Sequence, residues 1–102
     1  MHVIKRLPLL TFGRLHPRAV GPLDEWFRLA ENAVWRNFAD VRRSFGQTDV
    51  ARVKSGSSVC VFDIGGNKFR LIAKVSYEKG KVYVLRILTH KEYDADKWKA
   101  EL

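Results

Sequence analysis

The stretch SVCVFDIGGNKFRLIAKVSYEKGKVYVLRIL, residues 58–88, decides the fold. Its β-branched and aromatic residues fall into three runs, which are residues 58–64, 69–77 and 81–88. Such runs predict strands, and the connections between them are short enough for hairpins. The Gly-Gly-Asn segment at 65–67 can supply the positive φ angles of the first turn, and Gly80 can do so in the second. We therefore expect an antiparallel meander.

Side chains of the second run alternate between the two faces of the predicted sheet. One face carries the apolar residues Phe69, Leu71, Ala73 and Val75, and the other carries Arg70, Ile72, Lys74 and Ser76. We expect the first face to pack in the core and the second face to be partly cationic.

The chain before residue 58 has mostly helical spacing. The predicted elements are a short strand over residues 1–4, a brief helix over 8–15, a longer helix from Gly21-Pro22 to Val34, a helix over 39–45 and a loop over 44–57. The longer helix rests on apolar residues spaced three and four apart: Leu23, Trp26, Phe27, Ala30 and Val34. Asp24 and Glu25 would occupy its first turn, where the helix dipole favours acids.

A capping-box pattern follows the third predicted strand. Thr89 would be the N-cap and Glu92 the third helical residue, which predicts a short C-terminal helix. Trp26, Trp35 and Trp98 are expected to be packing residues. Together the elements predict an α+β fold, and 102 residues suit one domain that spans residues 1–102.

Charge is the first indication of function. Nineteen Lys and Arg residues against eleven Asp and Glu residues leave a net charge of +8 and a sequence pI near 10.0. This excess attracts polyanions, so nucleic acid is the leading partner, with solubility or protein partner choice as the alternative. The single Cys60 excludes a disulfide framework and a Cys-based zinc site. No apolar run approaches the ~18 residues of a membrane span, so we expect a cytoplasmic chain without a membrane partner.

Cations, an imidazole and a phenol gather between residues 68 and 93. The candidates for catalysis are His90, Arg70, Lys68 and Tyr93, and the candidates for binding RNA phosphate are Arg86, Lys74 and Lys91. RNA cleavage without a metal or other cofactor needs such a set. A base takes the ribose 2′-OH proton, cations hold the charge that builds on the phosphate, and an acid protonates the leaving 5′-oxygen.

Individual roles follow from side-chain chemistry. A free imidazole titrates near neutrality, so His90 is the candidate for proton transfer. Arg70 and Arg86 stay charged and can grip two phosphate oxygens, with Lys68 as a further cation. Tyr93 could stack on a nucleobase or donate a proton. For each residue the alternative is structural, because helix-start histidines, strand cations and tyrosines commonly serve only packing or solvation.

Four segments resemble HigB-type toxins of bacterial toxin–antitoxin systems, within the RelE/ParE superfamily. They are MHVI at 1–4, WRNFADVR at 35–42, VFDIGGNKFRLIA at 61–73 and LTHKEYD at 88–94. The resemblance implies N-terminal helices packed on a small, mainly antiparallel twisted sheet with a short C-terminal helix. It implies an mRNA interferase, typically acting on the translating ribosome and held inactive by a cognate HigA-like antitoxin with a helix-turn-helix domain. By the same resemblance Arg70 handles phosphate and His90 takes the position of a catalytic basic residue.

One position departs from the family pattern. Asp63 stands where similar sequences often carry Asn, and its carboxylate would repel phosphate unless Lys68 or Arg70 paired with it. Related ParE-type proteins keep the fold and poison DNA gyrase, so a non-catalytic toxin and a plain RNA-binding module are the alternatives to an endoribonuclease.

Overall fold

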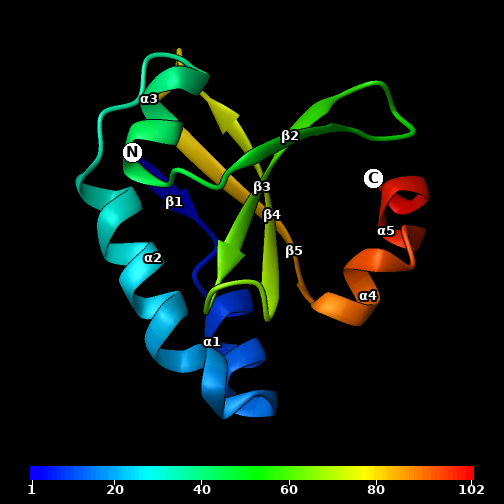
Figure 1. Ribbon diagram of the computed structural model, residues 1–102. Helices are drawn as coiled ribbons and strands as arrows, with labels where there is room; N and C mark the ends of the chain where they lie inside the picture. Colours follow the sequence, from blue (N-terminus) through cyan, green and yellow to red (C-terminus); the bar gives the residue numbers. More distant parts are fainter.

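The computed structural model describes residues 1–102, and Figure 1 shows a central twisted sheet between two groups of helices. The strands are β1 (His2–Ile4), β2 (Asp49–Arg52), β3 (Ser58–Ile64), β4 (Phe69–Ser76) and β5 (Lys81–Thr89). The helices are α1 (Leu7–Leu15), the 3₁₀ turn η1 (Pro17–Ala19), α2 (Val20–Asn32), α3 (Phe38–Ser44), α4 (His90–Asp94) and α5 (Lys97–Glu101). The predicted α+β class is therefore confirmed.

The five strands form one sheet in the order β1-β5-β4-β3-β2. Strands β2 to β5 pair antiparallel, so the predicted meander of β3, β4 and β5 is confirmed. The N-terminal strand β1 is parallel to β5, with Val3 opposite Val82. Since β1 ends at Ile4, opposite Tyr83, the second half of β5 has no strand on that side.

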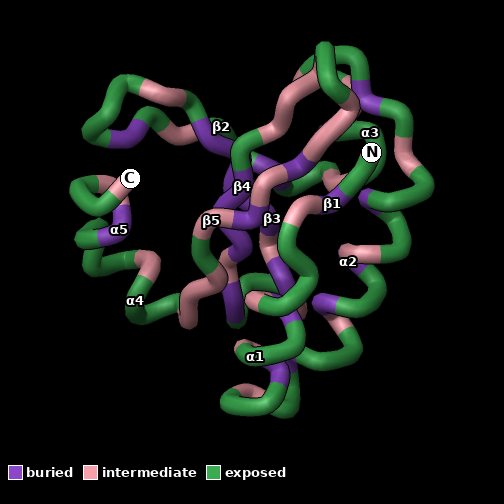
Figure 2. The backbone as a smooth tube through the Cα atoms, turned by 180° about the vertical axis from the view of Figure 1, so that it is seen from behind, coloured by how far each residue is buried: buried purple, intermediate pink, exposed green.

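The main core lies between the sheet and helices α1 to α3. Phe62 of β3 is fully buried at its centre, and the rings of Trp26, Trp35 and Phe45 surround it at centroid distances of 5.3, 6.2 and 5.4 Å. Figure 2 shows the buried residues running along the central strands. The predicted apolar face of β4 packs here, because Phe69, Leu71 and Ala73 belong to this cluster.

A second, smaller core covers part of the other face of the sheet. Trp98 of α5 is 2% exposed and packs with Ile72, Val59 and Val61. The indole Nε1 of Trp98 donates a hydrogen bond to the Tyr93 carbonyl oxygen at 3.1 Å, which fastens α4 to α5. The face expected to be partly cationic is thus apolar at Ile72 and cationic at its neighbours along β4.

Two predictions for the N-terminal half were wrong in detail. The turn η1 leads directly into α2, so the helix begins at Val20, and Asp24 and Glu25 lie beyond its first turn. It ends at Asn32, where the chain becomes extended, and Val34 is 77% exposed instead of part of the apolar stripe.

The expected loop over residues 44–57 contains strand β2. Asp49 lies opposite Val61, and Arg52 lies opposite Ser58. Because β2 is an edge strand with mostly exposed side chains, its sequence lacks the alternation that marks a half-buried strand. Thr48 just before it is buried and donates its hydroxyl to the Phe45 carbonyl at 2.7 Å.

The predicted capping box at the end of β5 is confirmed. The Thr89 hydroxyl accepts from the Glu92 backbone N–H at 3.2 Å, and the Glu92 carboxylate accepts from the Thr89 N–H at 2.9 Å. The C-terminal segment is two short helices and not one, because the chain turns between them at Asp96, whose φ is 61°.

Replacing Thr89 by Ala removes one half of this capping box. We expect Thr89→Ala to lower the free energy of unfolding by about 1 kcal/mol, the usual loss for an N-cap hydroxyl. Urea denaturation checks this, and the control is Thr11→Ala, which removes a hydroxyl from an exposed position on α1. Equal midpoints for wild type and Thr89→Ala would contradict it.

Burial raises the pKa of the Cys60 thiol to about 11, and the Tyr77 hydroxyl offsets this only in part. In the unfolded chain the thiol ionises near its ordinary value of 9.0, so the stability that the buried thiol contributes is complete below pH 9. It is lost as pH rises from 9 through 11, by up to about 3 kcal/mol. We expect slow iodoacetamide labelling of the native thiol at pH 8 and a shallower alkaline loss of stability in Cys60→Ala. Labelling as fast in buffer as in urea would refute this.

Candidate active site

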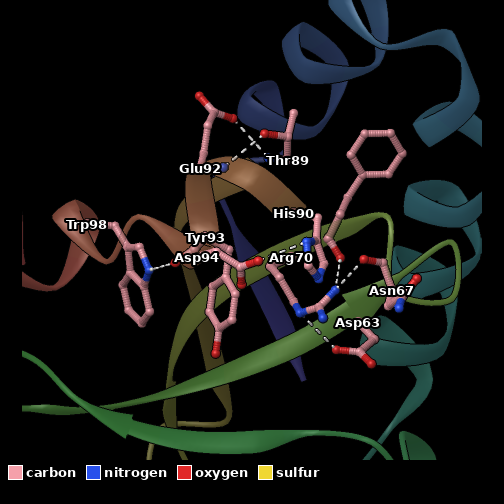
Figure 3. A network of polar contacts seen from close by, with 10 residues as sticks. Asp63, Asn67, Arg70, Thr89, His90, Glu92, Tyr93, Asp94 and Trp98 are labelled. Carbon is pink, nitrogen blue, oxygen red and sulfur yellow. Dashed lines mark hydrogen bonds and ion pairs between the residues drawn. The ribbon is translucent and has the colours of Figure 1, made fainter.

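Arg70 on β4 is held in place by the chain around it. It lies directly opposite Asp63 on β3, and its Nε is 3.2 Å from the Asp63 carboxylate oxygen Oδ1. Its Nη1 donates to the carbonyl oxygens of Asn67 at 2.8 Å and Phe69 at 3.2 Å (Figure 3). These bonds use Nε and Nη1 of the guanidinium, and Nη2 has no hydrogen-bond partner within the protein. The pairing that would offset the charge of Asp63 is therefore present.

The turn between β3 and β4 creates these contacts. Gly65 and Gly66 have φ angles of 65° and 74°, which L side chains rarely adopt. They return the chain so that Asp63 and Arg70 are cross-strand partners and the carbonyl of Asn67 faces the guanidinium.

Tyr93 of α4 lies between an arginine and a tryptophan. The Arg70 Cζ is 5.2 Å from the centre of the Tyr93 ring, and the Trp98 ring stacks on it at 5.4 Å. Figure 3 places these two groups on opposite sides of the phenol ring. Because both ring faces are covered, stacking on a nucleobase is disfavoured and the hydroxyl is the group left for chemistry.

His90 is the first residue of α4 and lies near Arg70. Its backbone N–H donates to the Lys68 carbonyl at 3.0 Å, next to the pairing of Leu88 with Arg70. The pairing of β4 with β5 thus brings the start of α4 next to the strand position of Arg70. Its Nδ1 is 3.1 Å from Oδ2 of Asp94, and the imidazole is 49% exposed. A carboxylate at Nδ1 favours the tautomer with a proton there, so Nε2 can accept a proton from a substrate.

The remaining predicted cations are spread more widely. Lys68 lies in the β3–β4 turn and Lys91 on α4, both exposed. Lys74 lies four residues along β4 from Arg70, about 13 Å at the usual rise of a strand. Arg86 is opposite Ile72, and its Nη1 turns back to the Leu85 carbonyl at 2.8 Å. The structure thus brings Arg70, Tyr93, the start of α4 at His90 and the backbone of Lys68 together in one site. Lys74 lies apart from this site.

Asp94 was missed as a partner of His90. The signal was present, because residues four apart on a helix lie on the same face. The backbone carbonyl of Asn67 was missed as a partner of Arg70, because side-chain type carries no information on backbone acceptors.

A hollow of about 380 Å³ lies on the Asp63 side of this site, lined by Phe45, Gly46, Gln47, Thr48, Asp63 and Gly66.

No group of three or more His, Cys, Asp and Glu side chains is arranged to hold a metal ion. None of the helices has the length and apolar character required to cross a membrane.

Comparison with known proteins places the chain in a family. It is 28% identical over 94 residues to mRNA interferase HigB of Escherichia coli O6:H1 (strain CFT073), a match that covers 92% of this chain and 89% of that protein. A shorter match of 34 residues, 33% of each chain, is 50% identical to mRNA interferase toxin HigB of Escherichia coli K12. Residues 19–96 match the family described as HigB_toxin, RelE-like toxic component of a toxin-antitoxin system. Since this match spans most of the sequence, the chain belongs to the HigB toxin family.

Proposed function

We propose that this toxin is an endoribonuclease that cleaves mRNA in the cytoplasm without a metal ion, by attack of a ribose 2′-OH on the adjacent phosphate. The observation that carries the proposal is that the exposed His90 begins α4 next to the strand position of Arg70, whose guanidinium is held in place, with the His90 N–H bonded to the Lys68 carbonyl. The relatives named mRNA interferase HigB support the same substrate class.

Arg70 acts on the phosphate. Its Nε and Nη1 are held by protein acceptors, so the guanidinium is already oriented when RNA arrives. Nη2 donates to a phosphate oxygen, and the bond strengthens as charge builds in the pentavalent transition state. A donor that needs no rearrangement at the moment of reaction is more effective than a flexible lysine, which is why Lys68 contributes only additional positive charge.

His90 and Tyr93 move the protons. Nε2 of His90 takes the proton of the 2′-OH, the new bond forms between the 2′-oxygen and phosphorus, and the bond from phosphorus to the 5′-oxygen breaks. The Tyr93 hydroxyl protonates that leaving oxygen. The products are a 2′,3′-cyclic phosphate and a free 5′-hydroxyl, so no water or metal ion enters the balance.

The hollow beside Asp63 would receive the nucleotide next to the cleaved bond. Its Gln47 and Asp63 side chains can hydrogen-bond to a base edge. The net charge of +8, to which Lys74, Lys91 and Arg86 contribute, would draw the chain to mRNA and to the ribosome on which we place the reaction. A cognate antitoxin, which the family implies, would hold the toxin inactive, and we propose a helix-turn-helix antitoxin.

Arg70→Ala and His90→Ala should each reduce cleavage at least about 100-fold, because each removes a group that acts in the transition state. Arg28→Ala, which removes the same charge from an exposed position on α2, should retain it. The measurement is mapping of mRNA 5′ ends after induction, together with digestion of RNA by the purified protein without ribosomes. Growth arrest with intact transcripts and damaged DNA would favour a gyrase poison, and a His90→Ala variant that only binds RNA more weakly would favour a binding module.

Asp94→Asn tests the orientation of the imidazole. The amide keeps the shape but loses the charge that favours a proton on Nδ1, so kcat should fall about tenfold with little change in KM. The loss should be modest because both side chains are about half exposed. The matched control is Asp96→Asn, which removes a carboxylate paired only with Lys99. Equal kcat values in the two variants would refute the role given to Asp94.

A further inference from the structure

A groove runs between α1 and the second half of β5, at the edge where β5 has no neighbouring strand. Its volume is about 780 Å³. The α1 side contributes Leu7, Phe12 and Leu15, and the β5 side contributes Leu85 and Ile87. The lining of the groove is therefore largely apolar, which is unusual for the open edge of a sheet.

Two leucine side chains that line this groove are exposed to solvent. Leu7 is 66% exposed and Leu15 is 74% exposed, although both belong to a helix whose other face packs on the core. Figure 2 shows much of the α1 backbone in the exposed colour. Single exposed apolar residues are ordinary, but two of them beside an apolar groove form a patch of the kind that binds protein.

Every charged residue that lines the groove is basic. They are Lys5, Arg6 and Arg86. Arg6 is already engaged, since it lies 3.6 Å from Asp24 and over the ring of Phe27. Lys5 has no acidic side chain within ion-pair distance, and Arg86 bonds only to a backbone carbonyl. An occupant that matches this surface carries acidic side chains beside apolar anchors.

We propose that the groove binds an acidic segment of the cognate antitoxin that carries apolar side chains. Its apolar groups cover Leu7 and Leu15, and its carboxylates pair with Lys5 and Arg86. A second copy of the toxin fits poorly, because two chains of charge +8 repel each other. RNA fits poorly too, because it would satisfy the cations and leave the leucines exposed.

The proposal rests on family membership and not on RNA cleavage. Arg70 and His90 do not line the groove, so binding of the antitoxin and cutting of RNA can be lost separately. An antitoxin bound here would lie against Arg86, which neighbours Arg70 diagonally across the two strands through the pairing with Ile72.

The test uses the full chain and the purified cognate antitoxin as the probe, titrated by isothermal titration calorimetry. Leu7→Glu and Lys5→Glu place a negative charge in the groove, and the first of them suits the start of a helix, so the fold is kept. Each should raise Kd at least about tenfold, as expected when an anchor or a paired cation is lost. Val34→Glu changes an exposed apolar residue that does not line the groove, so it should leave Kd unchanged.

Two further measurements separate this proposal from RNA cleavage and from other occupants. His90→Ala should bind the antitoxin as the wild type does, and Leu7→Glu should cleave RNA as the wild type does. Methyl resonances of Leu7, Leu15 and Leu85 should shift on titration. Unchanged affinity in both groove variants would overturn the proposal, and so would a loss of RNA binding in Leu7→Glu. A toxin dimer in sedimentation that this variant abolishes would also overturn it.

Discussion

The placement of the Arg70 guanidinium constrains most of the molecule around the site. Only 12% of the side chain is exposed, and a charged group this far from water must be paired and hydrogen-bonded. Asp63, two backbone carbonyls and the ring of Tyr93 meet that requirement. They come from β3, the turn, β4 and α4, so one buried charge ties together elements that are distant in the sequence.

The second core provides the mechanical support for this arrangement. Trp98 packs on Ile72 and stacks on Tyr93, and its indole N–H bonds to the Tyr93 carbonyl. The apolar contact therefore determines where α4 lies on the sheet, and α4 carries His90 and Asp94. A packing residue near the C-terminus thus determines where His90, the residue proposed for proton transfer, lies.

The sequence was informative where structure depends on neighbours along the chain. The meander, the Thr89 capping box and the burial of Trp26 follow from alternation, local hydrogen bonds and helical spacing. Strand β2 was not predictable in this way, because an exposed edge strand owes its form to pairing with β3. Likewise, the direction of Arg86 depends on the carbonyl of Leu85 and on α1, and no pattern in the sequence reports such contacts.

The distribution of acids explains how a chain with eleven carboxylates still presents a basic surface. Four of the aspartates are in ion pairs with Arg or Lys, and Asp94 lies against His90. Glu92 closes the capping box, and Glu31 accepts from the Val3 N–H. Each of these acids is engaged by a neighbouring group, whereas exposed cations such as Lys5, Lys74 and Lys91 are not in any of these ion pairs. The field around the protein is then dominated by unpaired positive charge. RNA and an acidic antitoxin segment would both be attracted by this field. An antitoxin in the α1–β5 groove would therefore oppose RNA binding by reducing this positive charge.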